Sequence, residues 1–168
     1  MAKQGITIVD VDLSKLLELL LKAQAEEWMA YYQYWYAAKM VKGFQRANIE
    51  AEFEKHAKEE KEHADWVADR IIELGGIPVQ YPNQWQEISP EGYAIALSDN
   101  SLDWLTTICK AEQLAIKRYQ EIAEFTEGKD FVTNSLAKKI LAEEVDHEQD
   151  MQDYYDDIIA LKEDLRKF

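Results

Sequence analysis

The feature that most constrains the fold is a repeat of apolar residues, at steps of three and four, in four long segments. Such a repeat puts the apolar side chains on one face of an α-helix. The segments cover about residues 11–43, 46–74, a stretch beginning after 98–101 and ending before Gly128, and 131–166. Only six Gly and three Pro occur in 168 residues, and good helix formers fill the segments. The sequence therefore predicts an all-α protein with a single domain over residues 1–168.

The connections between these segments predict how the helices run. The first helix would be capped by Asp12 or Asp10, and the second would stop at Gly75-Gly76. The first and second helices, like the third and fourth, are joined by short turns, so each pair should be antiparallel. The long connection from Gly76 to Asp99 could reach about 80 Å, more than the length of a helix of about 45 Å. We expect a four-helix bundle with two antiparallel pairs and one long crossover, or a loop that merely bulges out, with a short helix around residues 90–97.

Acidic residues interrupt each apolar face at about the same level. They are Glu27, Glu60, Glu112 and Glu144, and a histidine follows two of them by three positions, as His63 and His147. A buried carboxylate without a partner costs several kcal/mol, and four of them would also repel one another. Two divalent metal ions would neutralise four carboxylates, and a Glu and a His three residues apart can hold the same ion pair. The sequence therefore predicts a site for two metal ions inside the bundle.

Several nearby residues have more than one interpretation. Glu143 is also one turn from His147, but the spacing favours Glu144 as the ligand. His56 is expected at the surface and Glu26 in solvent. Cys109, one turn before Glu112, is either a small buried hydrophobic residue or a redox partner. The aromatic residues near the acids are expected to bond the carboxylates (Tyr31, Tyr34 and Tyr119) or to pack between subunits (Trp28, Trp35 and Trp66).

Motifs in all four segments resemble a known family. The stretch EWMAYYQYWYAAKM from Glu27, the motif EKEH from Glu60 and the motif ILAEEVDH ending at His147 resemble bacterioferritins. The stretch AEQLAIKRY, which contains Glu112, is closer to the Dps-like mini-ferritins called thioferritins. The chain is thus identified as similar to the ferritin-like superfamily, whose bundles hold a di-iron carboxylate site.

This resemblance implies an activity and a set of ligands. Glu27 and His63 would hold one iron, Glu112 and His147 the other, and Glu60 and Glu144 would bridge the two irons. The activity would be ferroxidase, the oxidation of Fe(II) by hydrogen peroxide or dioxygen, with ferric mineral stored in a homo-oligomeric shell.

Departures from the family patterns refine that expectation. Lys61 stands where bacterioferritins have a haem-binding Met, so no haem is expected. About 21 residues follow His147, too few for a fifth helix, which favours a 12-subunit shell. Thioferritins carry a cysteine pair, whereas this chain has Cys109 alone. A rubrerythrin-like peroxidase that stores no mineral is the alternative, and a non-enzymatic bundle is a third reading.

The net charge of −14 argues against partners that need a basic surface. We therefore expect no nucleic-acid binding and no association with anionic membranes. One cysteine allows no disulfide within the chain, and neither a signal peptide nor a membrane span is evident. A cytoplasmic protein is the expectation.

Overall fold

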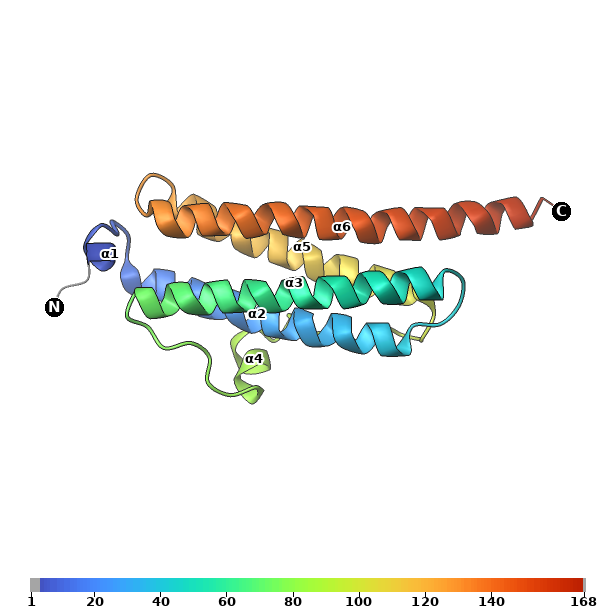
Figure 1. The fold of residues 1–168 in the computed structure, drawn as a ribbon, viewed down its shortest axis with the longest axis horizontal. Coiled ribbons are helices and arrows are strands. Elements are labelled where there is room, and N and C mark those ends of the chain that lie inside the picture. Colours follow the sequence, from blue (N-terminus) through green and yellow to red (C-terminus); the bar gives the residue numbers. More distant parts are fainter. Residues whose placement is uncertain (1–3, 168) are drawn as a thin grey trace.

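The computed structural model describes residues 4–167 and is a bundle of helices (Figure 1). The long helices are α2 (Leu13–Met40), α3 (Arg46–Glu73), α5 (Ser101–Thr126) and α6 (Phe131–Leu165). Two short helices, α1 (Gln4–Thr7) and α4 (Asn83–Ile88), complete the element order. Within residues 4–167 the only extended pairing is an isolated bridge between Lys42 and Asn100. The expected all-α fold is confirmed.

The long crossover spans the length of the bundle, as predicted. The bridge between Lys42 and Asn100 puts the start of α5 beside the end of α2. At the opposite end, the Asp10 N–H donates to the carbonyl of Lys129, 3.0 Å away, between the start of α2 and the α5–α6 turn. Helices α3 and α5 therefore run parallel, while α2 with α3 and α5 with α6 form antiparallel pairs (Figure 1). The alternative of a loop that only bulges out is wrong.

Local signals in the sequence set the ends of the helices. Of the two proposed caps, Asp12 is the one used, because its Oδ1 accepts from the N–H groups of Ser14 and Lys15 at 2.9 and 3.1 Å. At the end of α3, Gly75 has a φ of +83°, which favours glycine. A Cβ on Gly76 would lie 2.7 Å from a methyl carbon of Leu17.

The short helix expected around residues 90–97 is wrong in position. The crossover instead forms α4 at Asn83–Ile88, where Pro82 supplies a helical φ of −58° and the side chain of Gln84 accepts from the N–H groups of residues 80 and 81. Residues 90–97 form turns and irregular chain. The Gln33 amide on α2 donates to the carbonyl of Ala94 at 2.6 Å, which fastens this part of the crossover along the bundle.

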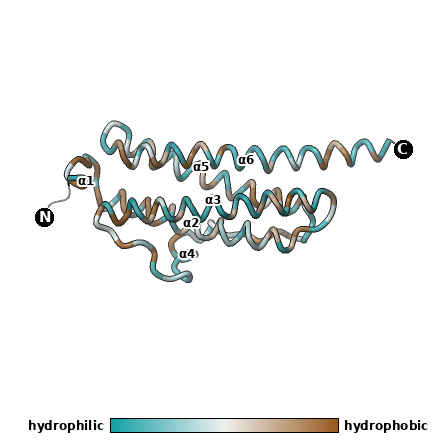
Figure 2. Tube along the Cα trace, viewed as in Figure 1, coloured by the Kyte–Doolittle hydropathy of each residue, from teal (hydrophilic) through white to brown (hydrophobic). Residues whose placement is uncertain are grey.

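The hydrophobic core is divided into two clusters with a polar layer between them. One cluster takes residues 16–23, 67–74, 119–123 and 137–140 from the four long helices. The other takes residues 34–41, 49–57, 104–108 and 151–158. Along each helix the predicted metal ligands fall in the gap between the two clusters. Hydrophobic and hydrophilic residues alternate along these helices (Figure 2), and among the described residues no helix is long and apolar enough to cross a membrane.

Candidate metal centre

All six predicted ligands meet in the polar layer between the two apolar clusters. Helix α2 brings Glu27, α3 brings Glu60 and His63, α5 brings Glu112, and α6 brings Glu144 and His147. None of the six is more than 4% exposed. The packing of apolar residues above and below this layer fixes the helices, so the polar side chains cannot turn away to solvent.

The six side chains form two groups that share two carboxylates. In one group, potential ligand atoms of Glu27, Glu60, His63 and Glu144 all lie within 4.8 Å of one another. The second group unites Glu60 and Glu144 with Glu112 and His147 under the same limit. The two shared glutamates are those expected to bridge two ions, and each group adds one terminal glutamate and one imidazole.

Both imidazole rings point the same nitrogen into the cluster. His63 Nδ1 lies 2.8 Å from Glu144 Oε1, and His147 Nδ1 lies 3.1 Å from Glu60 Oε1. Each outer nitrogen meets a further carboxylate: His63 Nε2 is 2.7 Å from Glu143, and His147 Nε2 is 3.2 Å from Glu59. An Nε2–H that donates to its outer carboxylate leaves Nδ1 as a lone pair that faces inward, as metal-binding histidines need.

Two tyrosines hold the terminal glutamates in place. The Tyr119 hydroxyl donates to Glu27 Oε1, and the Tyr34 hydroxyl donates to Glu112 Oε1. Burial, followed by the charge of the neighbouring glutamate, raises the pKa of both phenols well above the usual value, so both stay neutral donors. The expectation that tyrosines bond the carboxylates thus applies to these two, while Tyr31 packs against the second apolar cluster.

The terminal glutamates favour the protonated form in the absence of metal. Burial and then the charge of Glu144 raise the pKa of Glu27 well above its usual range. Burial and the charges of Glu60 and Glu144 do the same for the pKa of Glu112. For Glu60, burial on its own would raise the pKa, but the hydrogen bond with His147 and the charge of the nearby His63 outweigh burial and lower the pKa. The cluster therefore separates its acids into neutral terminal groups and an ionised shared one.

The histidines are cationic in the absence of metal. Burial on its own would lower the pKa of His63, but the adjacent carboxylates, Glu144 first, outweigh it and raise the pKa strongly. The same balance, with Glu144 and Glu60 as partners, raises the pKa of His147 to about 11. In the metal-free cluster, the two imidazolium ions thus supply positive charge that metal ions would otherwise bring.

The donor set and the space between its members suit cations. Several buried atoms lack a hydrogen-bond partner among the described residues, namely Glu27 Oε2, His63 Nδ1 and both carboxylate oxygens of Glu144. A cavity of about 20 Å³ is lined by Glu27, Glu60, Glu112 and Glu144. A volume of that order holds an ion or a water molecule. Oxygen and imidazole ligands in this number suit divalent first-row metals.

Two expectations about neighbouring residues are wrong. His56, placed at the surface by the sequence, is fully buried. Glu26, placed in solvent, is 7% exposed, because Arg118 of α5 and the Ser89 hydroxyl of the crossover both donate to it, at distances from 2.7 to 3.2 Å. These partners are far away in sequence, so the helical pattern of α2 gave no sign of them.

The tryptophans also differ in their surroundings. Trp28 stacks on Trp85 of α4, with ring centroids 5.9 Å apart, and so helps to hold the crossover. Trp66 packs 5.4 Å from the His63 ring and lies under the ammonium of Lys139. Trp35 is 42% exposed and remains available for a contact between subunits.

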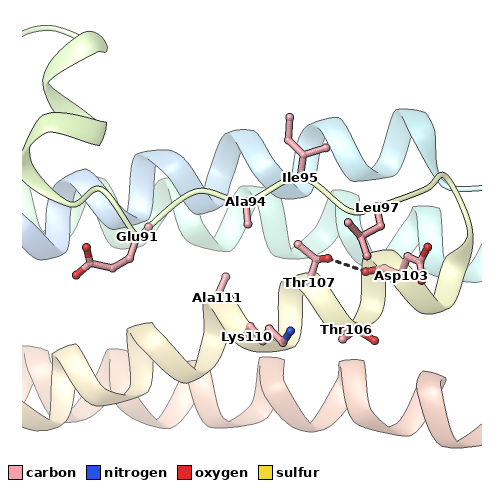
Figure 3. A pocket seen from close by; sticks show the side chains of 10 residues that line it. Glu91, Ala94, Ile95, Leu97, Asp103, Thr106, Thr107, Lys110 and Ala111 are labelled. Atoms are coloured by element: carbon pink, nitrogen blue, oxygen red, sulfur yellow. Dashed lines mark hydrogen bonds between the residues drawn. The ribbon is translucent and has the colours of Figure 1, made fainter.

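A larger cavity lies next to the small one at the six-residue cluster and shares Gly92 and Ala111 with it as lining residues. It measures about 370 Å³ and is bounded by residues 91–97 of the crossover and the first half of α5 (Figure 3). Its polar lining consists of Glu91, Asp103, Lys110 and two threonines, which do not form a group of metal-ligating side chains. Cys109 is half-buried beside a different hollow, and burial raises the pKa of its thiol.

Comparisons with known proteins agree with this geometry. Residues 17–160 match the ferritin-like domain. A DNA protection during starvation protein from Pyrococcus furiosus is 33% identical over 139 residues, which is 82% of this chain and 75% of that protein. A dodecameric thioferritin, a bacterioferritin-related protein from Bacteroides fragilis, superposes with a TM-score of 0.94 at 48% identity, covering 97% of this chain and 98% of its own.

More distant structures share the fold. Dps from Thermosynechococcus elongatus is 19% identical with a TM-score of 0.78, over 90% of this chain and 94% of its own. Since the family profile and the Pyrococcus relative each match most of the sequence, this chain belongs to the ferritin-like family.

Proposed function

We propose that this protein is a ferroxidase that stores iron, oxidising Fe(II) with hydrogen peroxide or dioxygen at the six-residue cluster. The observation that carries the proposal is the pair of four-residue groups that share Glu60 and Glu144 in a buried layer. Four carboxylates there balance the charge of two Fe(II) ions, with both imidazoles neutral. The ferritin-like match over residues 17–160 supports the same assignment.

The residues of the cluster have separate roles in this proposal. Glu27 and His63 bind one Fe(II), Glu112 and His147 bind the other, and Glu60 with Glu144 spans both. Hard carboxylate oxygens favour Fe(III) over Fe(II), so the ligand set promotes loss of an electron from each ion. Two ions together supply the two electrons that reduce one hydrogen peroxide to water.

Residues around the ligands keep them in position. Glu143 accepts from the outer nitrogen of His63, and Glu59 lies 3.2 Å from the outer nitrogen of His147, so that Nδ1 of each ring remains directed at the metal position. Tyr34 and Tyr119 hold one oxygen of each terminal glutamate and leave the other free to bind an ion.

Storage of mineral requires a closed shell of many copies, and we propose twelve. The thioferritin from Bacteroides fragilis, whose match with this chain covers 98% of its length, is described as dodecameric, which supports that number. Exposed apolar side chains on the outer side of α2 and on the crossover suit contacts between copies, with Trp35 at 42%, Ile95 at 62% and Leu97 at 99% exposed. Mass measurement in solution separates the shell from a rubrerythrin-like peroxidase, for which a dimer without an iron core is expected.

Activity assays with matched variants test the assignment. Glu60→Gln and His63→Gln should abolish rapid oxidation of Fe(II), whereas Glu62→Gln, an exposed glutamate on the same helix, should oxidise Fe(II) at the wild-type rate. Equal rates in all three variants would sink the proposal. Metal analysis adds a second measurement, since a bundle with no metal-related role would bind no ions at the cluster.

Binding to DNA is not part of this proposal, although the Pyrococcus relative is described as a DNA protection protein. The net charge of −14 opposes association with phosphates. In a gel-shift experiment at physiological salt we expect no retardation of duplex DNA, and tight binding would contradict this part of the account.

A further inference from the structure

Two neighbouring cavities meet where the crossover passes over the buried cluster. The larger one, of about 370 Å³, lies between residues 91–97 and the first half of α5 (Figure 3). The smaller one, of about 20 Å³, is lined by the four glutamates of the cluster. Gly92 and Ala111 line both cavities, and in Figure 3 the Ala111 methyl points from α5 toward the crossover. The larger cavity is therefore adjacent to the proposed position of the metal pair.

The boundary between the two cavities is built from small residues. We call this boundary the neck, and it consists of Ala30 on α2, Gly92 on the crossover, and Ala111 and Ala115 on α5, all of which line the smaller cavity. A Cβ on Gly92 would clash with the terminal carbon of Met29 on α2, so this position suits glycine. No side chain of the neck is larger than a methyl group, and the space inside it holds about one water molecule.

The neck leads to buried oxygens that have no partner. Glu27 Oε2 and both carboxylate oxygens of Glu144 lack a hydrogen bond among the described residues. Both glutamates line the smaller cavity. A buried carboxylate oxygen without a partner is unfavourable, so these atoms mark a position that a bound group completes. The neck therefore ends at the reacting position of the cluster.

Buried polar contacts hold the crossover over the neck. The Ser89 hydroxyl donates to Glu26 Oε1 at 2.7 Å, and the Arg118 Nε–H donates to Glu26 Oε2 at 3.0 Å. The Gly92 N–H in turn donates to the carbonyl of Ser89 at 3.1 Å. These contacts fasten the crossover to both α2 and α5, so the fold itself sets the width of the neck.

The chemistry of this route favours a neutral molecule over a cation. A divalent ion that moved between methyl groups would lose part of its hydration, which costs several kcal/mol, whereas hydrogen peroxide and dioxygen carry no charge. The charges around the larger cavity also balance. Glu91 pairs with Lys22 at 3.4 Å, and Asp103 shares the lining of the cavity with Lys110. This side of the bundle therefore has little net attraction for cations.

The α3–α6 side of the cluster has the opposite character. Glu143 lies 2.7 Å from the outer nitrogen of His63, and Glu59 lies 3.2 Å from that of His147. Both carboxylates have side chains that are 36% exposed, so they are in contact with solvent and with a proposed ligand at once. Exposed carboxylates attract hydrated cations, which makes this side the better route for Fe(II).

We propose that the neck admits the neutral oxidant, hydrogen peroxide or dioxygen, to the metal pair, while Fe(II) arrives from the α3–α6 side. This inference rests on the proposed ferroxidase, since an oxidant has no role without it. Ala111 lies at the junction of the two cavities, so the size of its side chain determines which oxidants reach the iron.

Reaction of bound Fe(II) with nitric oxide, a neutral molecule about the size of dioxygen, tests the neck without turnover. Ala111→Leu narrows the neck, and the larger cavity accommodates the part of the side chain that does not fit there. Stopped-flow absorbance of anaerobic, Fe(II)-loaded protein should give a rate at least about tenfold lower than that of the wild type. Ala51→Leu adds the same group at an exposed position of α3 and should react at the wild-type rate. Oxidation of Fe(II) by hydrogen peroxide should slow by the same factor in Ala111→Leu.

A variant of opposite sign tests the size limit. Ala111→Gly widens the neck and should raise the rate with tert-butyl hydroperoxide, relative to the rate with hydrogen peroxide, by about tenfold. Both the affinity for Co(II) and its rate of binding should equal those of the wild type in Ala111→Leu and in Ala111→Gly, because the cation takes the other route.

The results separate this proposal from the proposed function. Equal nitric oxide rates in the wild type and Ala111→Leu would overturn the proposal. A rate of Co(II) binding that falls as much as the nitric oxide rate would also overturn it, since the neck would then be the route of the cation. A wild type whose bound Fe(II) reacts with nitric oxide but is oxidised by neither hydrogen peroxide nor dioxygen would contradict only the proposed ferroxidase.

Discussion

Loading the buried cluster with metal should release protons, and their number follows from the protonation of the metal-free site. Raised pKa values make His63 and His147 cationic near neutral pH and favour protonated Glu27 and Glu112. Each of these four groups must lose its proton to become a ligand. Two incoming divalent ions should therefore expel about four protons, which leaves the net charge of the cluster unchanged.

This count sets how strongly affinity depends on pH. Each released proton makes binding about tenfold tighter per unit rise in pH, so the product of the two binding constants should rise about 10,000-fold per unit while all four groups are still protonated. Calorimetric titration with Zn(II) at pH 7, in buffers with different enthalpies of ionisation, measures the number of protons directly.

The control and the refuting result are both clear. Glu62→Gln should release the same number of protons as the parent protein, because this exposed glutamate has no part in the cluster. Release of fewer than two protons per pair of ions would mean that at least one of the two histidines is neutral before binding. That result would refute the electrostatic reasoning, whatever the affinity.

Three further predictions concern stability and the residues around the cluster. In the metal-free protein the raised pKa of His147 stabilises the fold fully below about pH 6.5. The free energy of unfolding should then fall by about 1.4 kcal/mol per pH unit as pH rises toward about 11. Urea denaturation at pH 7 and 9 checks this, and greater stability at pH 9 would contradict it. Glu143→Gln removes the carboxylate that orients His63 and should weaken metal binding by about 10- to 100-fold. Competition with a chelator measures the affinity, and an unchanged affinity would show that the contact is incidental. Glu26→Ala leaves Arg118 buried without its main partner and should lower the free energy of unfolding by about 3 kcal/mol, and a loss below about 1 kcal/mol in denaturant titration would count against that reading.

The fold followed from the sequence because its signals are local and repeated. Apolar steps of three and four, Asp12 as a cap and the Gly75-Gly76 stop are all properties of neighbouring residues. The position of the short crossover helix was missed, because it depends on Pro82 and on contacts of the crossover with α2. A single turn of helix has too little pattern to be located by periodicity.

The members of the cluster were also visible, since a charged residue on an apolar face stands out. The outer partners of the histidines were missed, although the sequence contains a signal for them. Each motif has two successive glutamates, Glu59-Glu60 and Glu143-Glu144, and the first of each pair lies within 3.2 Å of the outer nitrogen of the histidine that follows the other pair. The burial of His56 could not be read from α3 alone, because Asp150 lies 94 residues further along the chain.

The central claim is that two cations neutralise the inward glutamates, and a crystallographic map at the absorption edge of iron tests it most directly. Crystals soaked anaerobically in Fe(II) should show two anomalous peaks in the buried layer. One is expected between Glu27 and His63, the other between Glu112 and His147, with Glu60 and Glu144 in contact with both. A map without peaks in that layer after saturating Fe(II) would contradict the account.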